Sequence, residues 1–188
     1  MSSRQRFGVA AVAFVFGWAV IAWLTRPHPG ELLAEQDLPA DVQAEVDAVW
    51  DRFTEVFAPR LTCFDDVSLL LVESLPEGDA RYLVEEARIE ILIPTSPRRF
   101  RESLAHELAH HVEHGCDAFS DLRGDFIGLP DVGRDSWFAA ERWQETPSEQ
   151  WAETVVLMVN GERVRHAKTM ALPDGGADLV SAWAAGSG

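Results

Sequence analysis

The sequence predicts an α+β domain with a small sheet, preceded by one apolar segment at the N-terminus. Apolar residues recur at helical spacing in three segments, which are 40–57, 97–115 and 147–159. Short runs rich in β-branched and aliphatic residues are typical of strands and occur at 67–72, 82–84 and 88–93. The roughly 150 residues after the apolar segment are enough to build one hydrophobic core.

The N-terminal segment determines the expected location. Residues 7–24 carry no charge, and as a helix they would span about 27 Å, close to the thickness of the hydrocarbon layer. Arg4 and Arg6 precede this segment and Arg26 follows it, which favours a cytoplasmic N-terminus (residues 1–6) and an exported remainder. We expect an uncleaved signal anchor. A cleaved signal peptide is the alternative, but its apolar core is usually shorter and ends at a small-x-small site.

The remainder of the chain divides into three expected parts. Residues 25–39 contain three Pro and one Gly and should form a linker, residues 40–170 the domain, and residues 171–188 a fraying tail in which 179–183 could dock. Beyond Arg26 there remain 13 basic residues against all 31 acidic ones, a formal charge of about −18. This balance disfavours nucleic acid and anionic lipid surfaces as partners.

The elements can be justified in chain order. The apolar stripe of 40–57 is expected to pack into the core. Residues 76–79 are a turn signal between strands. Residues 117–145 are rich in Asp and Gly with little periodicity, and we expect a long loop beside the functional site, with a short turn around Trp137 and Phe138.

The segment 97–115 is expected to be an amphipathic helix. Ser96 is a suitable N-cap, Pro97 suits the first helical position, and Gly115 is a natural stop. One arc of this helix is apolar and should pack into the core. The opposite arc carries Ser103, His106, Glu107, His110, His111, Glu113 and His114.

This polar arc contains an HExxH motif, His106-Glu107-Leu108-Ala109-His110. Residues i and i+4 lie one above the other on a helix, so His106 and His110 can bind one Zn²⁺. Glu107 can then reach a water at the metal and act as general base. His111 and His114 are expected to be solvated or to support the site. The longer metzincin motif is absent, because positions 113 and 116 are Glu and Cys.

A catalytic zinc site needs a third protein ligand and one open position. The segment Thr146-Pro147 begins the helix 147–159, in which Glu149 and Glu153 share one face. Glu149 is the favoured ligand, and Glu153 is the other candidate. In the alternative interpretation neither binds metal, and Thr146 and Glu149 form a capping box.

The sequence HELAH is followed, 39 residues after its second His, by the sequence E-x-x-A-E. This arrangement resembles the gluzincin group of zinc metallopeptidases, and most of all the small zincin-like domains related to the catalytic domain of anthrax lethal factor. The resemblance covers roughly residues 85–160. It implies a zincin-like metallopeptidase fold, Glu149 as third ligand and Glu153 as a supporting residue. It also implies a strand at the edge of the substrate cleft, for which 88–93 is the candidate; an ordinary core strand is the alternative.

The match to this group has one gap. A Tyr that assists the transition state in the toxin is replaced here by the stretch 140–143. Arg142, His166 and Tyr82 are the candidates to stabilise an oxyanion instead, and the sequence does not choose among them.

Two cysteines, Cys63 and Cys116, are the only ones in the chain. An even number in an exported domain suggests a disulfide, and two buried thiols are the alternative. The expected function is a membrane-anchored, zinc-dependent peptidase that acts on peptide or protein substrates outside the cytoplasm, with Glu107 as base. The alternative is a catalytically silent, metal-binding ectodomain that binds a protein partner.

Overall fold

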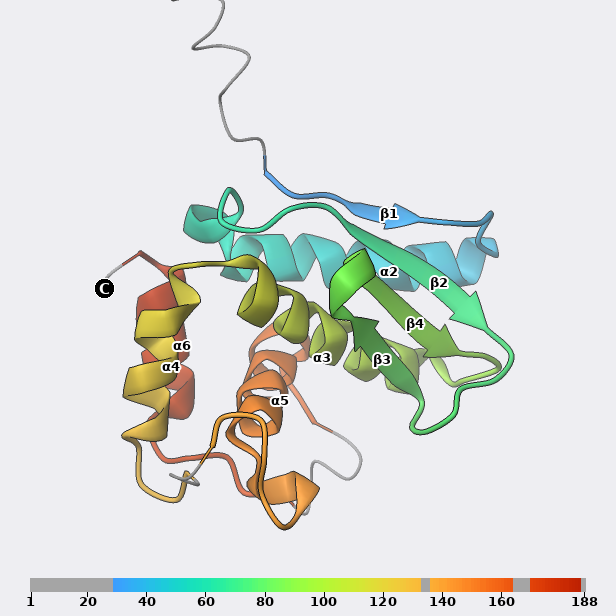
Figure 1. Cartoon of the computed structure of the whole chain (residues 1–188). Coiled ribbons are helices and arrows are strands. Elements are labelled where there is room, and N and C mark those ends of the chain that lie inside the picture. The colour runs from blue at the N-terminus through green and yellow to red at the C-terminus, as the bar shows by residue number, and fades with distance from the viewer. Residues whose placement is uncertain (1–28, 133–135, 164–169, 187–188) are drawn as a thin grey trace, which may run out of the picture.

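The computed structural model describes residues 29–132, 136–163 and 170–186, which contain four strands and five α-helices (Figure 1). The α+β prediction is confirmed at this level. The expected membrane segment 7–24, the N-terminus 1–6 and the start of the linker lie outside the described residues. Within the described ranges, no helix has the length and apolar character needed to cross a bilayer.

The four strands form one mixed sheet in the order β1-β2-β4-β3. Their bounds are β1 Leu32–Ala34, β2 Val67–Val72, β3 Ala80–Leu83 and β4 Arg88–Leu92. β1, β2 and β4 are parallel, and β3 runs antiparallel to β4. β1 lies within residues 25–39, the segment expected to be a linker, and pairs with β2. A three-residue strand has too short a pattern to be recognised from sequence.

Of the two alternatives for residues 88–93, the sheet order supports the core strand. β4 lies between β2 and β3 and is therefore an inner strand, while β3 and β1 form the two edges. Ile89 and Ile91 of β4 are buried, whereas all four residues of β3 are only partly buried. The strongly apolar segment is therefore the inner strand β4, and the less apolar β3 lies at the edge of the sheet.

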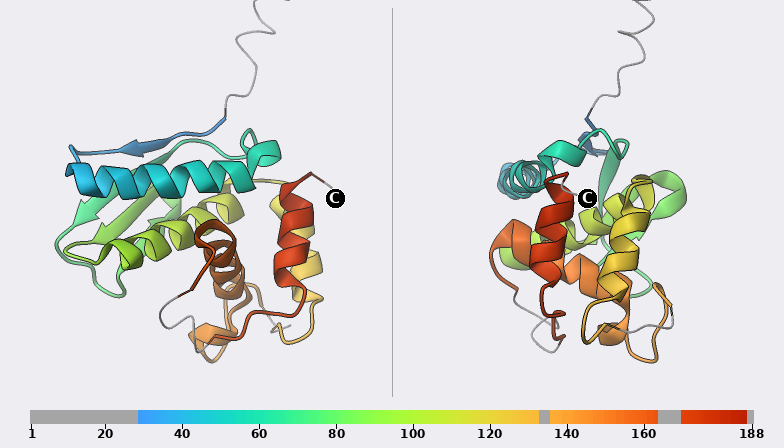
Figure 2. Two further views of the ribbon diagram at one scale, coloured as in Figure 1. Left: turned by 180° about the vertical axis from the view of Figure 1, so that it is seen from behind. Right: turned by 90° about the vertical axis from the view of Figure 1, so that its left-hand side faces the viewer.

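Three helices build the main core beside the sheet. They are α2 Ala40–Val56, α3 Pro97–Gly115 and α5 Pro147–Asn160, close to the ranges expected from periodicity. α2 and α3 lie against one face of the sheet, and α5 packs across α3 (Figures 1 and 2). α5 ends at Gly161, whose φ of 71° is a left-handed conformation that glycine adopts without strain.

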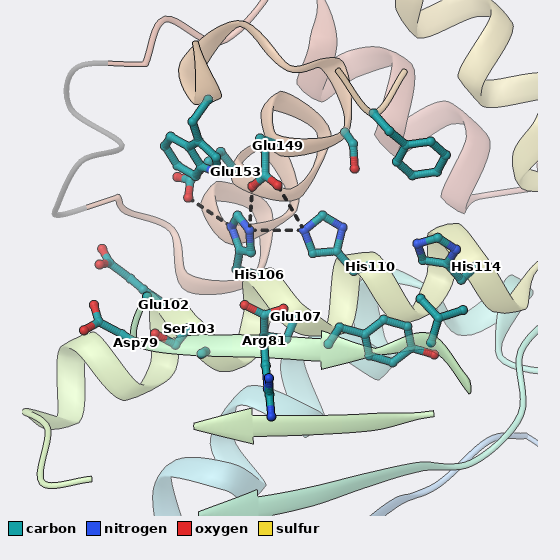
Figure 3. A pocket seen from close by; sticks show the side chains of 17 residues that line it. Asp79, Arg81, Glu102, Ser103, His106, Glu107, His110, His114, Glu149 and Glu153 are labelled. Carbon is teal, nitrogen blue, oxygen red and sulfur yellow. Dashed lines mark hydrogen bonds and ion pairs between the residues drawn. The ribbon is translucent and has the colours of Figure 1, made fainter. Parts of the chain in front are cut away.

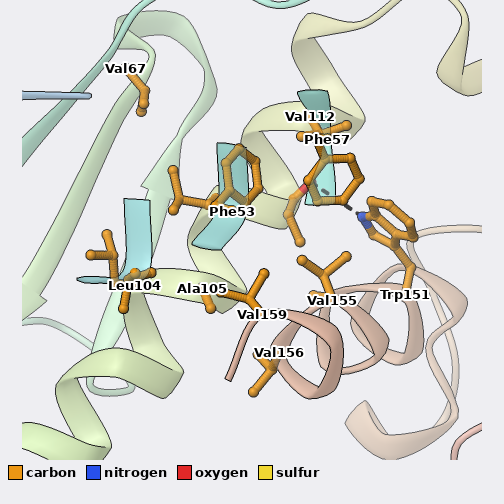
Figure 4. Close-up of a cluster of buried hydrophobic side chains, with 14 of the residues drawn as sticks. Phe53, Phe57, Val67, Leu104, Ala105, Val112, Trp151, Val155, Val156 and Val159 are labelled. Carbon is orange, nitrogen blue, oxygen red and sulfur yellow. Dashed lines mark hydrogen bonds between the residues drawn. The ribbon is translucent and has the colours of Figure 1, made fainter. Parts of the chain in front are cut away.

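Aromatic and β-branched side chains fill the space between these helices (Figure 4). Phe53 of α2 packs against Phe57, which directly follows α2, and Phe57 packs edge-on against Trp151 of α5; all three are fully buried. The Trp151 indole N–H donates to the carbonyl oxygen of Ala109 over 3.2 Å and so joins α5 to α3 directly. The side chains Ala105, Ala109 and Ala152 are also fully buried, and their small size lets helices approach closely.

Two helices were missed by the sequence analysis. α4 Phe119–Ile127 lies in the segment expected to be a loop, and α6 Gly176–Ala184 in the expected tail. Phe119, Leu122 and Phe126 form a buried helical stripe that Asp and Gly neighbours obscured. Trp183 of α6 is buried and packs edge-on against Phe119 with ring centroids 5.9 Å apart. The domain therefore extends beyond residue 170.

The predicted disulfide between Cys63 and Cys116 is present, with Cα atoms 4.9 Å apart. Cys116 directly follows α3, and Cys63 precedes β2. The bond therefore ties the C-terminal end of α3 to the segment that leads into the sheet.

Replacing both cysteines by serine should lower the free energy of unfolding by roughly 4 kcal/mol, because a loop of this length constrains the unfolded chain. Urea titrations of the full chain in mild detergent, with reduced parental protein as a second comparison, measure the loss. A change well below about 1 kcal/mol would mean that the bond does not stabilise this fold.

Candidate metal centre

Helix α3 begins as expected. Ser96 is the N-cap, and its hydroxyl accepts from the Arg99 backbone N–H over 3.3 Å. The polar arc, however, is not a solvated face. Glu107, His111 and Glu113 are buried, because α5, the sheet edge and the segment before β2 cover this side of α3 as well. A helix whose polar side is also covered must satisfy each polar group inside the protein.

Helix α5 brings Glu149 and Glu153 over α3. Thr146 makes no side-chain capping hydrogen bond, so the capping-box interpretation of Glu149 does not hold. Glu149 and Glu153 both point towards His106 (Figure 3). The first two turns of α5 thus supply carboxylates to the HExxH motif.

Three side chains converge at one point of a cleft of about 510 Å³. The Nε2 atoms of His106 and His110 are 3.2 Å apart, and the Glu149 carboxylate lies 3.0 Å from the first and 3.8 Å from the second (Figure 3). Ligands about 2.0–2.1 Å from a tetrahedral zinc are separated by about 3.3 Å. The three donors therefore match that spacing, and the described residues contain this one group able to hold a metal.

Each imidazole is held by a second carboxylate through its other nitrogen. His106 Nδ1 lies 3.1 Å from Glu153, and His110 Nδ1 lies 2.9 Å from Glu113. With Nδ1–H donated to a carboxylate, the Nε2 lone pair of each neutral ring faces the shared point. Two such lone pairs 3.2 Å apart repel unless a metal ion or a proton lies between them.

These contacts shift the pKa values of His106 and Glu149 in opposite directions. Burial lowers the pKa of His106, but the hydrogen bonds to Glu149 and Glu153 outweigh it and raise that pKa well above its ordinary value. Burial raises the pKa of Glu149, but its contacts with His106 outweigh this effect and lower it. Without a metal, a proton on His106 therefore supplies the positive charge that these carboxylates require.

Glu107 lines the same cleft, between the two histidines and strand β3 (Figure 3). Its carboxylate accepts from the backbone N–H of Tyr82. Burial raises the pKa of Glu107, and the two histidines partly offset this shift. A buried carboxylate with a raised pKa beside a metal-binding point is chemically suited to accept a proton.

His111 was expected to be solvated or to support the site, but it is buried beside the sheet. Its Nε2 lies 2.8 Å from the Asp65 carbonyl oxygen, so it must carry a hydrogen and donate. Nδ1 is then an acceptor for the Tyr82 hydroxyl, 3.0 Å away. Burial raises the pKa of Tyr82 to about 12. This pair secures β3 to α3.

Two of the three candidates for oxyanion stabilisation are engaged with other partners. The Tyr82 hydroxyl is bonded to His111, and Arg142 forms an exposed ion pair with Glu145. His166 lies outside the described residues. His114 lies one turn beyond His110 and does not belong to the metal-binding group (Figure 3).

Sequence reasoning missed Glu113 and its partners. The Glu113 carboxylate accepts from His110, from the Ser148 hydroxyl at 2.8 Å and from the Trp137 indole. Trp143, in the one-turn 3₁₀ helix Trp143–Glu145, stacks on His106 and donates to Glu149. The three-residue spacing of His110 and Glu113 was a usable signal for the first of these.

Comparisons with protein-family models, with curated proteins and with solved structures find no match to this chain. The interpretation of the site therefore depends on its geometry and chemistry.

Replacing Glu149 by alanine should weaken zinc binding far more than replacing Glu153, because only Glu149 reaches the shared point. Glu153→Ala removes the partner of His106 and should cost about 10–100-fold in affinity. Zinc titrations under one chelator buffer measure both, with the exposed Glu162→Ala as control. Loss of metal in Glu153→Ala but not in Glu149→Ala would reverse the two roles.

The chain has one tyrosine, so its ionisation can be followed directly by absorbance near 295 nm. Because burial raises the pKa of Tyr82 to about 12, the folded protein should titrate about two units above the unfolded chain. Stability from this group is fully present below about pH 10 and is lost as the pH rises towards 12. A midpoint near 10 in still-folded protein would contradict the buried contact with His111.

Proposed function

We propose that this chain is a zinc-dependent hydrolase of the zincin class. The observation that carries the proposal is the convergence of two imidazole Nε2 atoms and the Glu149 carboxylate within 3.0–3.8 Å, with each Nδ1 on its own carboxylate. Two nitrogen donors and one carboxylate are a donor set typical of catalytic zinc, which leaves one position open. When bound, zinc supplies a more acidic water and polarises a carbonyl group.

The reaction that these residues support is hydrolysis of a peptide bond. Glu107 takes a proton from the attacking water as the new C–O bond forms. It then passes that proton to the amine as the C–N bond breaks, so the atoms balance and Glu107 returns to its carboxylate form. Glu153 and Glu113 hold the imidazoles in the orientation that keeps Nε2 available.

An extended peptide is favoured as substrate by strand β3. The Leu92 N–H donates to the Asp79 carbonyl, so Arg81 and Leu83 continue the bonded pairs with β4. The backbone groups of Ala80 and the carbonyl group of Tyr82 then point away from β4, at an edge that lines the cleft, while the Tyr82 N–H is bonded to Glu107. A substrate strand can add to such an edge.

We further propose that the domain works outside the cytoplasm on an N-terminal membrane anchor. The disulfide supports an oxidising compartment, and the uncharged run 7–24 supports the anchor. A C-terminal reporter that is active only outside the cytoplasm tests this orientation, and membrane fractionation tests the anchor.

One observation favours the alternative of a silent, metal-binding ectodomain that serves as a protein-interaction module. Of the three candidate oxyanion donors, Tyr82 and Arg142 are engaged elsewhere. The retained Glu107 favours the enzyme, because a binding module needs no base beside its metal.

Glu107→Gln should retain about one zinc per chain and the parental fold, but lose peptide hydrolysis, because an amide cannot accept the proton of water. The full chain in mild detergent is assayed against a peptide library, with a chelator-treated sample as control. Cleavage by Glu107→Gln at the parental rate would exclude Glu107 as base. No cleavage by zinc-loaded parental protein would favour the silent ectodomain.

A further inference from the structure

The cleft carries exposed apolar side chains. Four large hydrophobic residues are exposed in the described parts of the chain, and three of them line this cleft. These are Val84, Phe138 and Trp143, which are 52%, 54% and 42% exposed. Single exposed apolar residues are common, but a group in a concave site indicates a surface for a ligand.

The exposed ring of Phe138 is held by stacking. It lies nearly parallel to His114, with centroids 5.6 Å apart and planes at 10°, and His114 stacks in turn on Tyr82 at 5.9 Å. The Arg123 guanidinium of α4 lies 5.3 Å from the centre of the same Phe138 ring. Phe138, His114 and Val84 form an apolar wall of the cleft. Stacking holds its rings in place before a ligand binds, which limits the entropy lost on binding.

The wall lies close to the proposed reaction centre. His114 follows His110 by one helical turn, about 6 Å along α3, and Val84 directly follows β3. The opposite end of the cleft carries Asp79, Glu102 and Ser103 (Figure 3). An extended chain along β3 would thus pass from a polar end, past Trp143 beside His106, to an apolar end formed by Phe138 and Val84.

We propose that the cleft selects peptides with a large apolar or aromatic side chain, which packs against Phe138, Val84 and His114. This inference rests on the proposed peptidase function and names its substrate class. Removing a large apolar group from such a contact reduces kcat/KM by roughly 10–200-fold. A positively charged side chain at the same position would lose water and lie close to the Arg123 guanidinium.

The test uses zinc-loaded full chain in mild detergent and peptides that differ at one position, occupied by Phe, Leu, Ala, Asp or Lys. Each position on either side of the cut is varied in turn. At one position, kcat/KM for Phe and Leu should exceed that for Ala by about tenfold or more. Phe138→Ala should remove this preference, so that kcat/KM for the Phe and Leu peptides falls to the level of the Ala peptide. Leu33→Ala is the matched control, because Leu33 is similarly exposed but lies on β1.

Val84→Ser gives a second variant in case Phe138→Ala alters the loop that carries it. Cleavage with no apolar preference, or a preference that both variants retain, overturns the inference while the peptidase function stands. Binding of the same peptides to zinc-loaded Glu107→Gln, followed by fluorescence anisotropy, provides a readout without turnover. Apolar preference in binding without cleavage by the parental protein supports this subsite and overturns the peptidase function instead.

Discussion

The packing of α5 across α3 is the constraint on which the rest of the site depends. It places two carboxylates of α5 over His106, while Ser148 of the same helix helps to hold Glu113 against His110. The Trp151 indole fixes this crossing by bonding to a carbonyl of α3. Because the Nδ1 atom of each imidazole is hydrogen-bonded to a carboxylate, both rings are held in orientation and both Nε2 atoms stay directed at one point.

The same packing concentrates negative charge in a largely buried place. Glu107, Glu113, Glu149 and Glu153 lie around two histidines, with Arg163 on the outer side of Glu153 at 3.1 Å. Buried carboxylates are costly unless charge and hydrogen bonds compensate them. We therefore expect a bound cation or proton to stabilise the fold, because the arrangement requires a positive charge between the two Nε2 atoms.

The parts that could be predicted from sequence are those set by local pattern. The Ser96 cap, the helices around the HExxH motif and Glu149, and the Cys63–Cys116 bond followed from spacing and composition. The buried polar contacts could not be predicted so directly. Helical geometry places His111 and Glu113 on the polar side of α3, and only tertiary packing decides that this side is buried.

The edge position of β3 and the helix α6 could not be predicted from the sequence for a related reason. β3 has four partly buried residues, and its importance comes from its position at the edge, which no local pattern records. α6 is short and lies among small residues, and Trp183 gives it an anchor only because Phe119 and Trp151 lie nearby. Long-range contacts therefore decided these elements.

Trp137 donates its indole N–H to Glu113, and Phe138 is the next residue. The carboxylate that orients His110 thus also holds the loop that carries the exposed aromatic ring. Such a shared residue gives thermodynamic linkage, and linkage between two sites is reciprocal. An ion bound to His110 would reduce the motion of the loop that carries Phe138. A ligand packed against Phe138 would in turn raise the affinity of the site for the ion.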